Sequence, residues 1–181
     1  GISSGLGGRL RALEVDRYFK SARDVPKDSA GRPDFDRPDA LHMERAAADI
    51  RTLLAGGRIE LPAHDMVSQT TRFDSGEYFS LGENEVLIVD SIFASHPLFR
   101  EAAKAAPSLN IYLEAPAVVR LARRLARDKV SRGKPVAENL KGWGRILENE
   151  KAHILPLKDG ADMVLNLVTQ EELRGLPGAY S

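Results

Sequence analysis

The sequence predicts an α/β fold in which helices cover both faces of a parallel sheet. Segments with strand character alternate along the chain with segments of helical periodicity, which is typical of a parallel sheet. Val86 to Val89 form a continuous, β-rich apolar run, as expected of a strand buried on both faces. The length of 181 residues fits one domain with one sizeable core, so we expect a single domain over residues 1–181.

The expected elements follow from local patterns. Apolar residues at helical spacing predict a helix over residues 39–55, with Asp39 as its N-cap and Gly56 and Gly57 at its end. Prolines make residues 20–38 a loop, and a polar excursion is expected over residues 62–84. Strands are expected at 10–16, 58–61, 85–93, 109–113 and 162–168, and further helices at 98–106, 117–131 and 136–155, before a frayed tail at 169–181.

The composition narrows the function classes. Acidic and basic residues balance at 26 each, which argues against a broad surface for nucleic acid or anionic membrane. The absence of cysteine excludes disulfides and thiolate metal sites and favours a reducing compartment. Neither an apolar run long enough to span a membrane nor a signal peptide is visible. We therefore expect a cytoplasmic protein with a small-molecule partner and neither nucleic acid nor membrane as partner.

Two acids stand at the ends of expected strands. Asp16 closes the strand over residues 10–16, and Asp90 follows the apolar run of the strand over 85–93. Ligands of open parallel sheets bind beyond the carboxyl ends of the strands. Asp16 is thus a candidate general base at a substrate hydroxyl, and Asp90 a candidate magnesium ligand. A helix cap or a surface acid is the alternative for each.

A basic helix is the most concentrated charge in the sequence. Its arginines lie three or four residues apart and therefore on neighbouring positions of one side of the helix: Arg120, Arg123, Arg124 and Arg127. Arg132 and Lys134 continue the cluster into a loop. Guanidinium groups can bind phosphate bidentately and stabilise a transferring phosphoryl group. The alternatives are a solvated face that pairs with acids such as Glu114 and Asp128, and a nucleic-acid helix, although no aromatic stacking pattern accompanies it.

Two loops carry further candidates for ligand contact. Phe35 and Asp36 precede the expected helix, and an ionised carboxylate there can accept hydrogen bonds from two vicinal sugar hydroxyls. The alternative, a loop that leads into a helix cap, does not account for the presence of Phe35 and Asp36. His64 lies in a second loop, and the four histidines show no metal-ligand spacing such as H-E-x-x-H.

Taken together and in order, five segments resemble the uridine kinase and phosphoribulokinase family. They are DRYF at 16–19, DFDRPDA at 34–40, LPAHDMVS at 61–68, VLIVDSIFA at 86–94 and RLARRLARDKVSRGK at 120–134. The resemblance covers roughly residues 10–168. It implies a three-layer P-loop NTPase-type fold with an arginine-bearing lid at about 128–136. It also implies ATP and Mg²⁺ as cofactors, phosphoryl transfer to the 5′-hydroxyl of a nucleoside, and homo-oligomers as an assembly state.

The resemblance also implies roles for single residues. Asp16 would accept the hydroxyl proton, while Asp36 and Arg124 would hold the ribose hydroxyls. Arg127 and Arg132 would contact phosphates, with catalysis by charge stabilisation as phosphoryl transfer requires.

The substrate and cofactor pockets follow in the same way. Phe19 and Phe35 would line the substrate pocket, and Asp90 would stand near magnesium where the family often has Glu. His64 and Gln69 occupy the positions where members of the family often have a Tyr and a His that recognise the pyrimidine base. Lys134 would join the residues that bind the ATP phosphates.

The sequence departs from the family pattern in three places. Met66 replaces a common aromatic, and Ser91 stands where Gly is usual. The opening of a phosphate loop is visible at Gly1, Ser3, Ser4 and Gly5, but no Lys with a following Ser or Thr comes after it. The family's first strand and the helix after the loop do not fit before residue 16. We therefore expect the natural chain to carry residues before Gly1 and between about Gly5 and Leu6 that this sequence lacks.

Two other functions remain open on these residues. One is a kinase for another small alcohol, such as a pantothenate-like or sugar-phosphate substrate, which the pocket departures at His64, Met66 and Gln69 allow. The other is a catalytically silent relative that binds a nucleotide or a partner protein. The missing Lys favours this second function, whereas the retained acids and arginines disfavour it.

Overall fold

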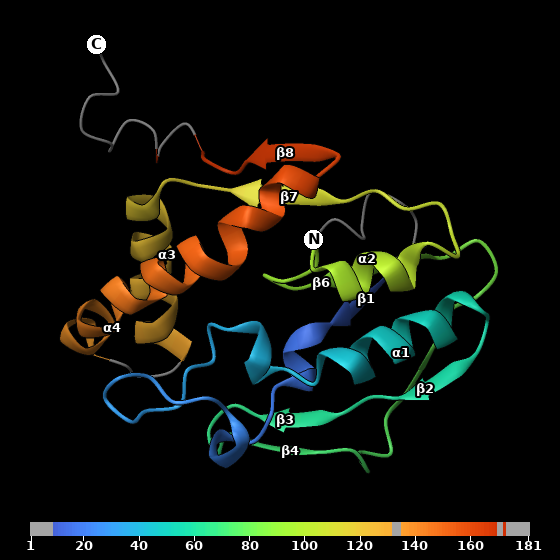
Figure 1. Ribbon diagram of the computed structural model, residues 1–181, viewed down its shortest axis with the longest axis horizontal. Coiled ribbons are helices and arrows are strands. Elements are labelled where there is room, and N and C mark those ends of the chain that lie inside the picture. Colours follow the sequence, from blue (N-terminus) through green and yellow to red (C-terminus); the bar gives the residue numbers. More distant parts are fainter. Residues whose placement is uncertain (1–8, 132–134, 170–171, 173–181) are drawn as a thin grey trace. The chain divides into compact units, whose positions relative to one another are not determined.

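The computed structural model describes residues 9–131, 135–169 and 172, drawn as ribbons and labelled elements in Figure 1. The chain divides into two compact units, Gly1–Ser108 and Leu109–Ser181. The single domain over 1–181 stays a prediction, since two compact units can belong to one domain. Among the helices of the described residues, none is long and apolar enough to cross a membrane.

A parallel strand pair lies at the centre of the first unit. β1 (Leu10–Glu14) pairs with β6 (Val86–Asp90) (Figure 1). The register places Glu14 opposite Asp90. This confirms the parallel pairing expected from the sequence. The chain leaves β1 in a 3-10 helix, Val15–Tyr18, so the strand ends two residues before Asp16 rather than on it.

Helices of the first unit pack their apolar faces inward. α1 (Met43–Leu54) lies beside α2 (Pro97–Ala103) in Figure 1 and buries Ala46, Ile50 and Leu53. The expected cap at Asp39 is wrong, because residues Pro38–Ala40 form a separate 3-10 helix and His42 is the N-cap of α1. Gly56 ends the helix at φ 78°, a left-handed conformation that glycine adopts without a steric cost.

The stretch after α1 contains four short strands. β2 (Arg58–Glu60) pairs antiparallel with β5 (Tyr78–Ser80), and β3 (Ala63–Asp65) pairs antiparallel with β4 (Thr70–Arg72). Only the first matches an expected strand; the other three lie within the polar excursion expected over 62–84, for which the sequence predicts no strand. Strands of three residues whose side chains are mostly exposed leave no alternating apolar pattern in the sequence.

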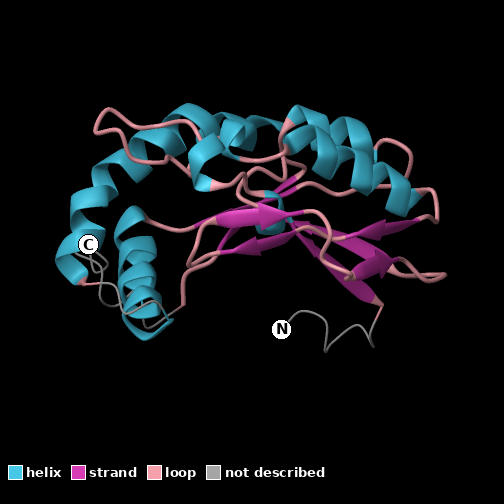
Figure 2. Ribbon diagram, turned by 90° about the horizontal axis from the view of Figure 1, so that it is seen from below, coloured by secondary structure: helices cyan, strands magenta, loops and turns pink. Residues whose placement is uncertain are grey.

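The second unit has its own parallel pair, β7 (Ile111–Glu114) with β8 (Met163–Asn166). Between the two strands lie α3 (Ala117–Ser131), whose bounds match the expectation, and α4 (Val136–Asn149). The helix expected to run to residue 155 changes at Glu150–Ile154 into a π-helical turn and then into a 3-10 helix, Leu155–Gly160. Figure 2 distinguishes these helices from the strands by colour.

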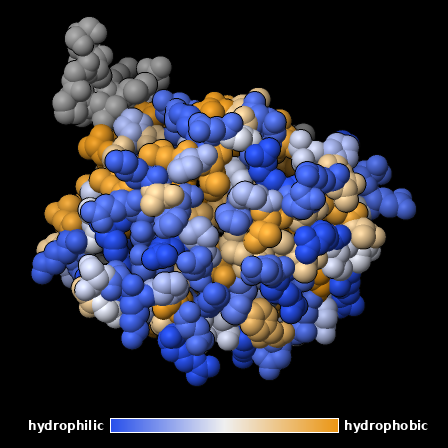
Figure 3. Space-filling view, viewed as in Figure 1, coloured by the Kyte–Doolittle hydropathy of each residue, from blue (hydrophilic) through white to orange (hydrophobic). Residues whose placement is uncertain are grey.

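Burial differs between the described parts. The first unit has a core of fully buried side chains that includes Leu13, Tyr18 and Phe93. In the second unit, every residue of β8 is exposed, including Met163 and Leu165 at 44% and 39%. Apolar side chains also lie among polar ones on the face shown in Figure 3. The helices therefore leave the apolar side chains of β8 open to solvent in this unit.

Candidate functional site

Two carboxylates lie at the carboxyl edge of the β1–β6 pair. Asp16 is exposed in the 3-10 helix that directly follows β1, and Asp90 is the exposed last residue of β6. Because Glu14 is the register partner of Asp90, the turn that bears Asp16 begins beside the end of β6. The expected placement of both acids at one edge of the sheet is therefore seen.

A buried polar pair fixes the turn behind Asp16. The hydroxyl of Tyr18 donates to Oδ2 of Asp49 at 2.8 Å, and Nε of Arg45 donates to the same carboxylate at 3.1 Å. Burial, and then the charge of Asp49, raise the pKa of Tyr18 well above its ordinary value. No sequence motif predicts this pair. Its only signal is an acid on the apolar face of α1, beside Ala46 and Ile50.

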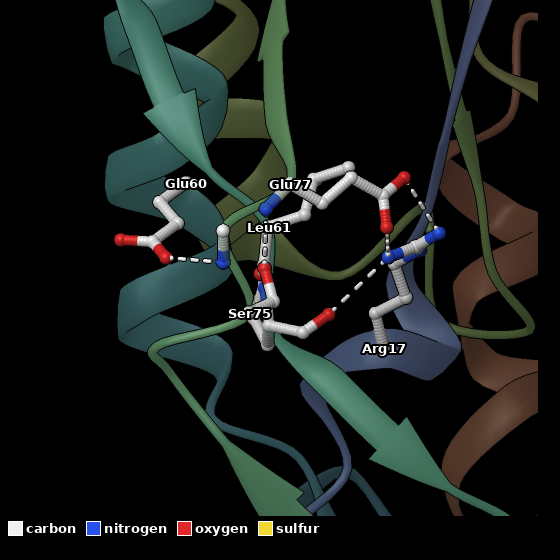
Figure 4. A network of polar contacts seen from close by, with 7 residues as sticks. Arg17, Glu60, Leu61, Ser75 and Glu77 are labelled. Carbon is white, nitrogen blue, oxygen red and sulfur yellow. Dashed lines mark hydrogen bonds and ion pairs between the residues drawn. The ribbon is translucent and has the colours of Figure 1, made fainter.

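Arg17 connects the same turn to the segments that follow β2 and precede β5. Its guanidinium donates to both carboxylate oxygens of Glu77, at 2.8 and 3.0 Å, and to the carbonyl of Pro62 at 3.4 Å. Figure 4 shows this ion pair beside the hydroxyl of Ser75, which donates to the carbonyl of Leu61 at 2.6 Å. The turn that bears Asp16 is thus held by a buried hydrogen bond on one side and an ion pair on the other.

Three predicted ligand-contact residues come together in one aromatic cluster. The ring centroids of Phe19 and Phe35 lie 5.4 Å apart, edge to face, and those of Phe19 and His64 lie 5.7 Å apart. The rings of Phe35 and His64 are 6.3 Å apart. We call these three residues the aromatic cluster. Its flat, partly exposed rings offer an apolar wall at the end of the turn that bears Asp16.

His64 belongs at the same time to a polar network that no sequence motif predicts. Its Nδ1 lies 2.7 Å from Oγ1 of Thr71, and this hydroxyl donates to the main-chain carbonyl of Phe19. Thr71 is also held through its own amide, which donates to Oγ of Ser21 at 3.0 Å. Burial lowers the pKa of His64, although the charge of Asp65 acts in the opposite direction.

An open cavity of about 560 Å³ lies against the β3–β4 hairpin. It is lined by Ala63, His64, Asp65, Thr70, Thr71 and Arg72. The cavity and the aromatic cluster share His64, so a ligand in this cavity can reach the imidazole ring.

The other predicted substrate residues of the first unit flank the cluster. Asp36 is half-buried, and its amide donates to the buried carboxylate of Asp34 at 3.4 Å. Gln69 is exposed and adopts a φ of 52°, with its carbonyl accepting from the amide of Ala22 at 2.9 Å. Met66, in the place of the family's aromatic residue, is 50% exposed.

Arginines of the basic helix α3, in the second unit, form ion pairs with acidic side chains. Arg127 lies 2.8 Å and Arg124 3.6 Å from the wholly buried carboxylate of Asp128, and Nε of Arg124 donates to Oδ1 of Asn139 at 3.3 Å. Arg120 pairs with Glu150 at 2.8 Å. These pairs account for part of the helix's charge, but the side chain of Arg127 remains 52% exposed and keeps donors for an anionic ligand.

Several predicted residues lie outside the described part of the chain. They are Gly1, Ser3, Ser4 and Gly5 of the phosphate-loop segment, and Arg132 and Lys134 of the lid. The expected insertion between about Gly5 and Leu6 falls in the same undescribed stretch.

Mg²⁺ and ATP, the cofactors of P-loop kinases, can be tested against the residues that are described. Within residues 9–131, 135–169 and 172, no group of three or more histidine and acidic side chains is placed to hold a metal by itself. Mg²⁺ usually binds one or two carboxylates together with phosphate oxygens and water. The exposed carboxylate of Asp90 at the sheet edge fits this ligand set.

Comparison with known proteins gives a consistent match. Residues 11–174 match the profile of the Phosphoribulokinase / Uridine kinase family. A uridine kinase of Halobacterium salinarum is 26% identical over 91% of this chain and 71% of its own length. One from Lactobacillus helveticus is 26% identical over 87% of this chain and 72% of its own length.

Solved structures agree on the fold. A protein described as a candidate kinase of a fructose transport system from Silicibacter sp. TM1040 superposes with a TM-score of 0.61 at 16% identity, over 90% of this chain and 77% of its own. Phosphoribulokinase from Rhodobacter spheroides gives a TM-score of 0.59 at 13% identity, over 91% and 62% of the two chains. The fold is thus the α/β fold of P-loop kinases, and the chain belongs to the phosphoribulokinase and uridine kinase family.

Proposed function

We propose that this chain transfers the γ-phosphoryl group of ATP to the 5′-hydroxyl of a nucleoside. Family membership makes it a phosphotransferase by descent. The nucleoside as acceptor rests on the adjacency of Asp16 and the aromatic cluster. Asp16, the candidate base for the hydroxyl, is three residues from Phe19. Phe19 contacts the rings of Phe35 and His64, and together they offer a surface for a flat ring.

The acceptor side of the reaction is assigned mainly to residues of the first unit. Asp16 accepts the proton of the hydroxyl, and the ring of the nucleobase lies against Phe19, Phe35 and His64. Asp36 accepts hydrogen bonds from ribose hydroxyls beside this wall. Phosphoryl transfer depends on positioning more than on covalent chemistry, and the two restraints on the turn, at Tyr18 and Arg17, serve that positioning.

The donor side is assigned to charged groups. Asp90 supplies a carboxylate to Mg²⁺, and the metal, when bound with ATP, neutralises charge on the phosphates. Arg127 presents exposed donors to phosphate oxygens, and Arg132 and Lys134, which follow it in the sequence, are assigned to the same phosphates. Arg124, although on the same helix, is assigned to the ribose hydroxyls of the acceptor. Gly1, Ser3, Ser4 and Gly5 are assigned to the ATP phosphates on their sequence pattern alone. We expect an aqueous, cytoplasmic reaction with a small-molecule acceptor.

The direct test is release of ADP from ATP and Mg²⁺ by the purified protein, measured with a panel of acceptors. The panel contains uridine, cytidine, adenosine, pantothenate and a sugar phosphate. Nucleoside-dependent release supports the proposal. Release only with pantothenate or the sugar phosphate would show that the acceptor is not a nucleoside. No release of ADP with any acceptor would favour a catalytically silent relative that binds nucleotide.

A further inference from the structure

The hydrogen bonds around Thr71 determine which nitrogen of His64 carries the proton. A threonine hydroxyl has one hydrogen to donate. A main-chain carbonyl can only accept, so this hydrogen goes to the carbonyl of Phe19. Oγ1 of Thr71 must then accept from the imidazole, 2.7 Å away, and the donor is Nδ1–H of His64.

This assignment leaves Nε2 of the neutral imidazole with a bare lone pair. Burial lowers the pKa of His64, which favours the neutral ring, although the neighbouring carboxylate of Asp65 acts in the opposite direction. Thr71 itself is fixed, because it is the register partner of His64 on β4 and its amide bonds to Ser21. The aromatic cluster thus contains one hydrogen-bond acceptor of fixed identity.

We propose that Thr71 is a specificity-determining residue, which holds His64 in the Nδ1–H tautomer so that Nε2 selects a ring that presents an N–H donor at its edge. This inference rests on the proposed function and narrows its acceptor. Uracil offers such a donor at N3, and cytosine offers one at its exocyclic amine. A base that offers only acceptors at that edge leaves Nε2 without a partner in a half-buried site, which costs binding free energy.

The first measurement concerns the protein alone. Two-dimensional ¹H–¹⁵N correlation of the histidine rings distinguishes protonated from bare ring nitrogens, and His64→Gln identifies the signals of His64. We expect a protonated Nδ1 and a bare Nε2 in the wild type. Thr71→Ser should keep this pattern because it keeps the hydroxyl, whereas Thr71→Val should lose it. A wild-type ring protonated at Nε2 alone would overturn the inference.

The second measurement is equilibrium binding of uridine and 3-methyluridine, which lacks the N3 donor. We expect the wild type and Thr71→Ser to bind uridine about 10-fold more tightly than 3-methyluridine, the effect of one unsatisfied acceptor. The ratio should fall several-fold in Thr71→Val. If Thr71→Val leaves the ratio of the two affinities unchanged, the preference for uridine is a steric effect of the methyl group. That result would overturn the role of Thr71.

The two measurements separate this inference from the proposed function. Binding of neither nucleoside, with the expected tautomer in the first measurement, would refute the nucleoside acceptor and with it the selection by Nε2. Nucleoside binding with the opposite tautomer would leave the proposed function intact and refute the role of Thr71.

Discussion

The buried hydroxyl of Tyr18 donates a 2.8 Å hydrogen bond to Oδ2 of Asp49, and so joins the turn after β1 to the middle of α1. Tyr18→Phe removes this donor and leaves the buried carboxylate of Asp49 to its ion pair with Arg45. We expect a loss of about 2 kcal/mol in the free energy of unfolding, as for a hydrogen bond to a charged group. Urea unfolding followed by circular dichroism measures it.

Tyr78→Phe is the matched control, since Tyr78 is 52% exposed. It should change the free energy of unfolding by no more than about 0.5 kcal/mol. Equal stabilities of the two variants would show that the Tyr18–Asp49 hydrogen bond contributes nothing.

Asp16→Asn tests the general base. The amide keeps the size of the side chain but cannot take a proton from the acceptor hydroxyl, so kcat should fall by about 100-fold or more while KM changes little. Steady-state kinetics with the acceptor identified in the panel measures both constants. Asp24→Asn, at an exposed acid of the next 3-10 helix, should leave them unchanged. An equal effect on kcat and on acceptor affinity would argue against a base at Asp16.

Asp128→Asn tests the buried anion of the basic helix. Asp128 is wholly buried and pairs with Arg124 and Arg127. Removing one partner of a buried ion pair leaves uncompensated charge, and we expect a loss of about 3 kcal/mol, the low end of such costs because both arginines are partly exposed. Fluorescence of Trp143, the only tryptophan and a residue of α4, reports unfolding of the same unit. Asp159→Asn, at an exposed site, should leave the transition in place; if Asp128→Asn does the same, the buried pair is not stabilising.

Arg123 and Glu172 provide a test by titration. Hydrogen bonds from Arg123, at 2.7 and 2.8 Å, lower the pKa of Glu172 to about 2. A carboxyl with a lowered folded-state pKa stabilises the fold above its unfolded pKa, and this contribution is lost as pH falls from about 4.5 towards 2. Carboxyl ¹³C NMR should show the low midpoint in the wild type and a return towards the ordinary value in Arg123→Ala. A midpoint near 4.5 in both proteins would rule the ion pair out in solution.

The sequence predicts the elements that have strong local patterns. The apolar run at 86–89 gives β6, and the periodic basic segment gives α3 with its observed bounds. The β3–β4 hairpin escapes prediction because it is held by hydrogen bonds across the hairpin and to Ser21, not by a local apolar pattern.

The residues of the candidate site also differ in whether a local pattern predicts them. Asp16, Phe19, Phe35 and His64 are recognisable from short motifs, and the last three do come together as rings in contact. Asp49 and Thr71 are not recognisable from motifs, because their roles depend on residues that are distant in the sequence. Asp49 bonds to Tyr18, 31 positions away, and Thr71 bonds to the carbonyl of Phe19, 52 positions away. The placement of an acid, Asp49, on the apolar face of α1 is the one local sign of either contact.

The hydrogen-bond chain from His64 through Thr71 ends on a main-chain oxygen, and this has an evolutionary consequence. No substitution of the Phe19 side chain removes that oxygen, so under the proposed assignment the proton arrangement on the imidazole depends on the hydroxyl at position 71. A single base change that turns a threonine codon into an alanine codon would release the ring while leaving the aromatic wall intact. The substrate range of such an enzyme can therefore change at a residue that need not touch the substrate.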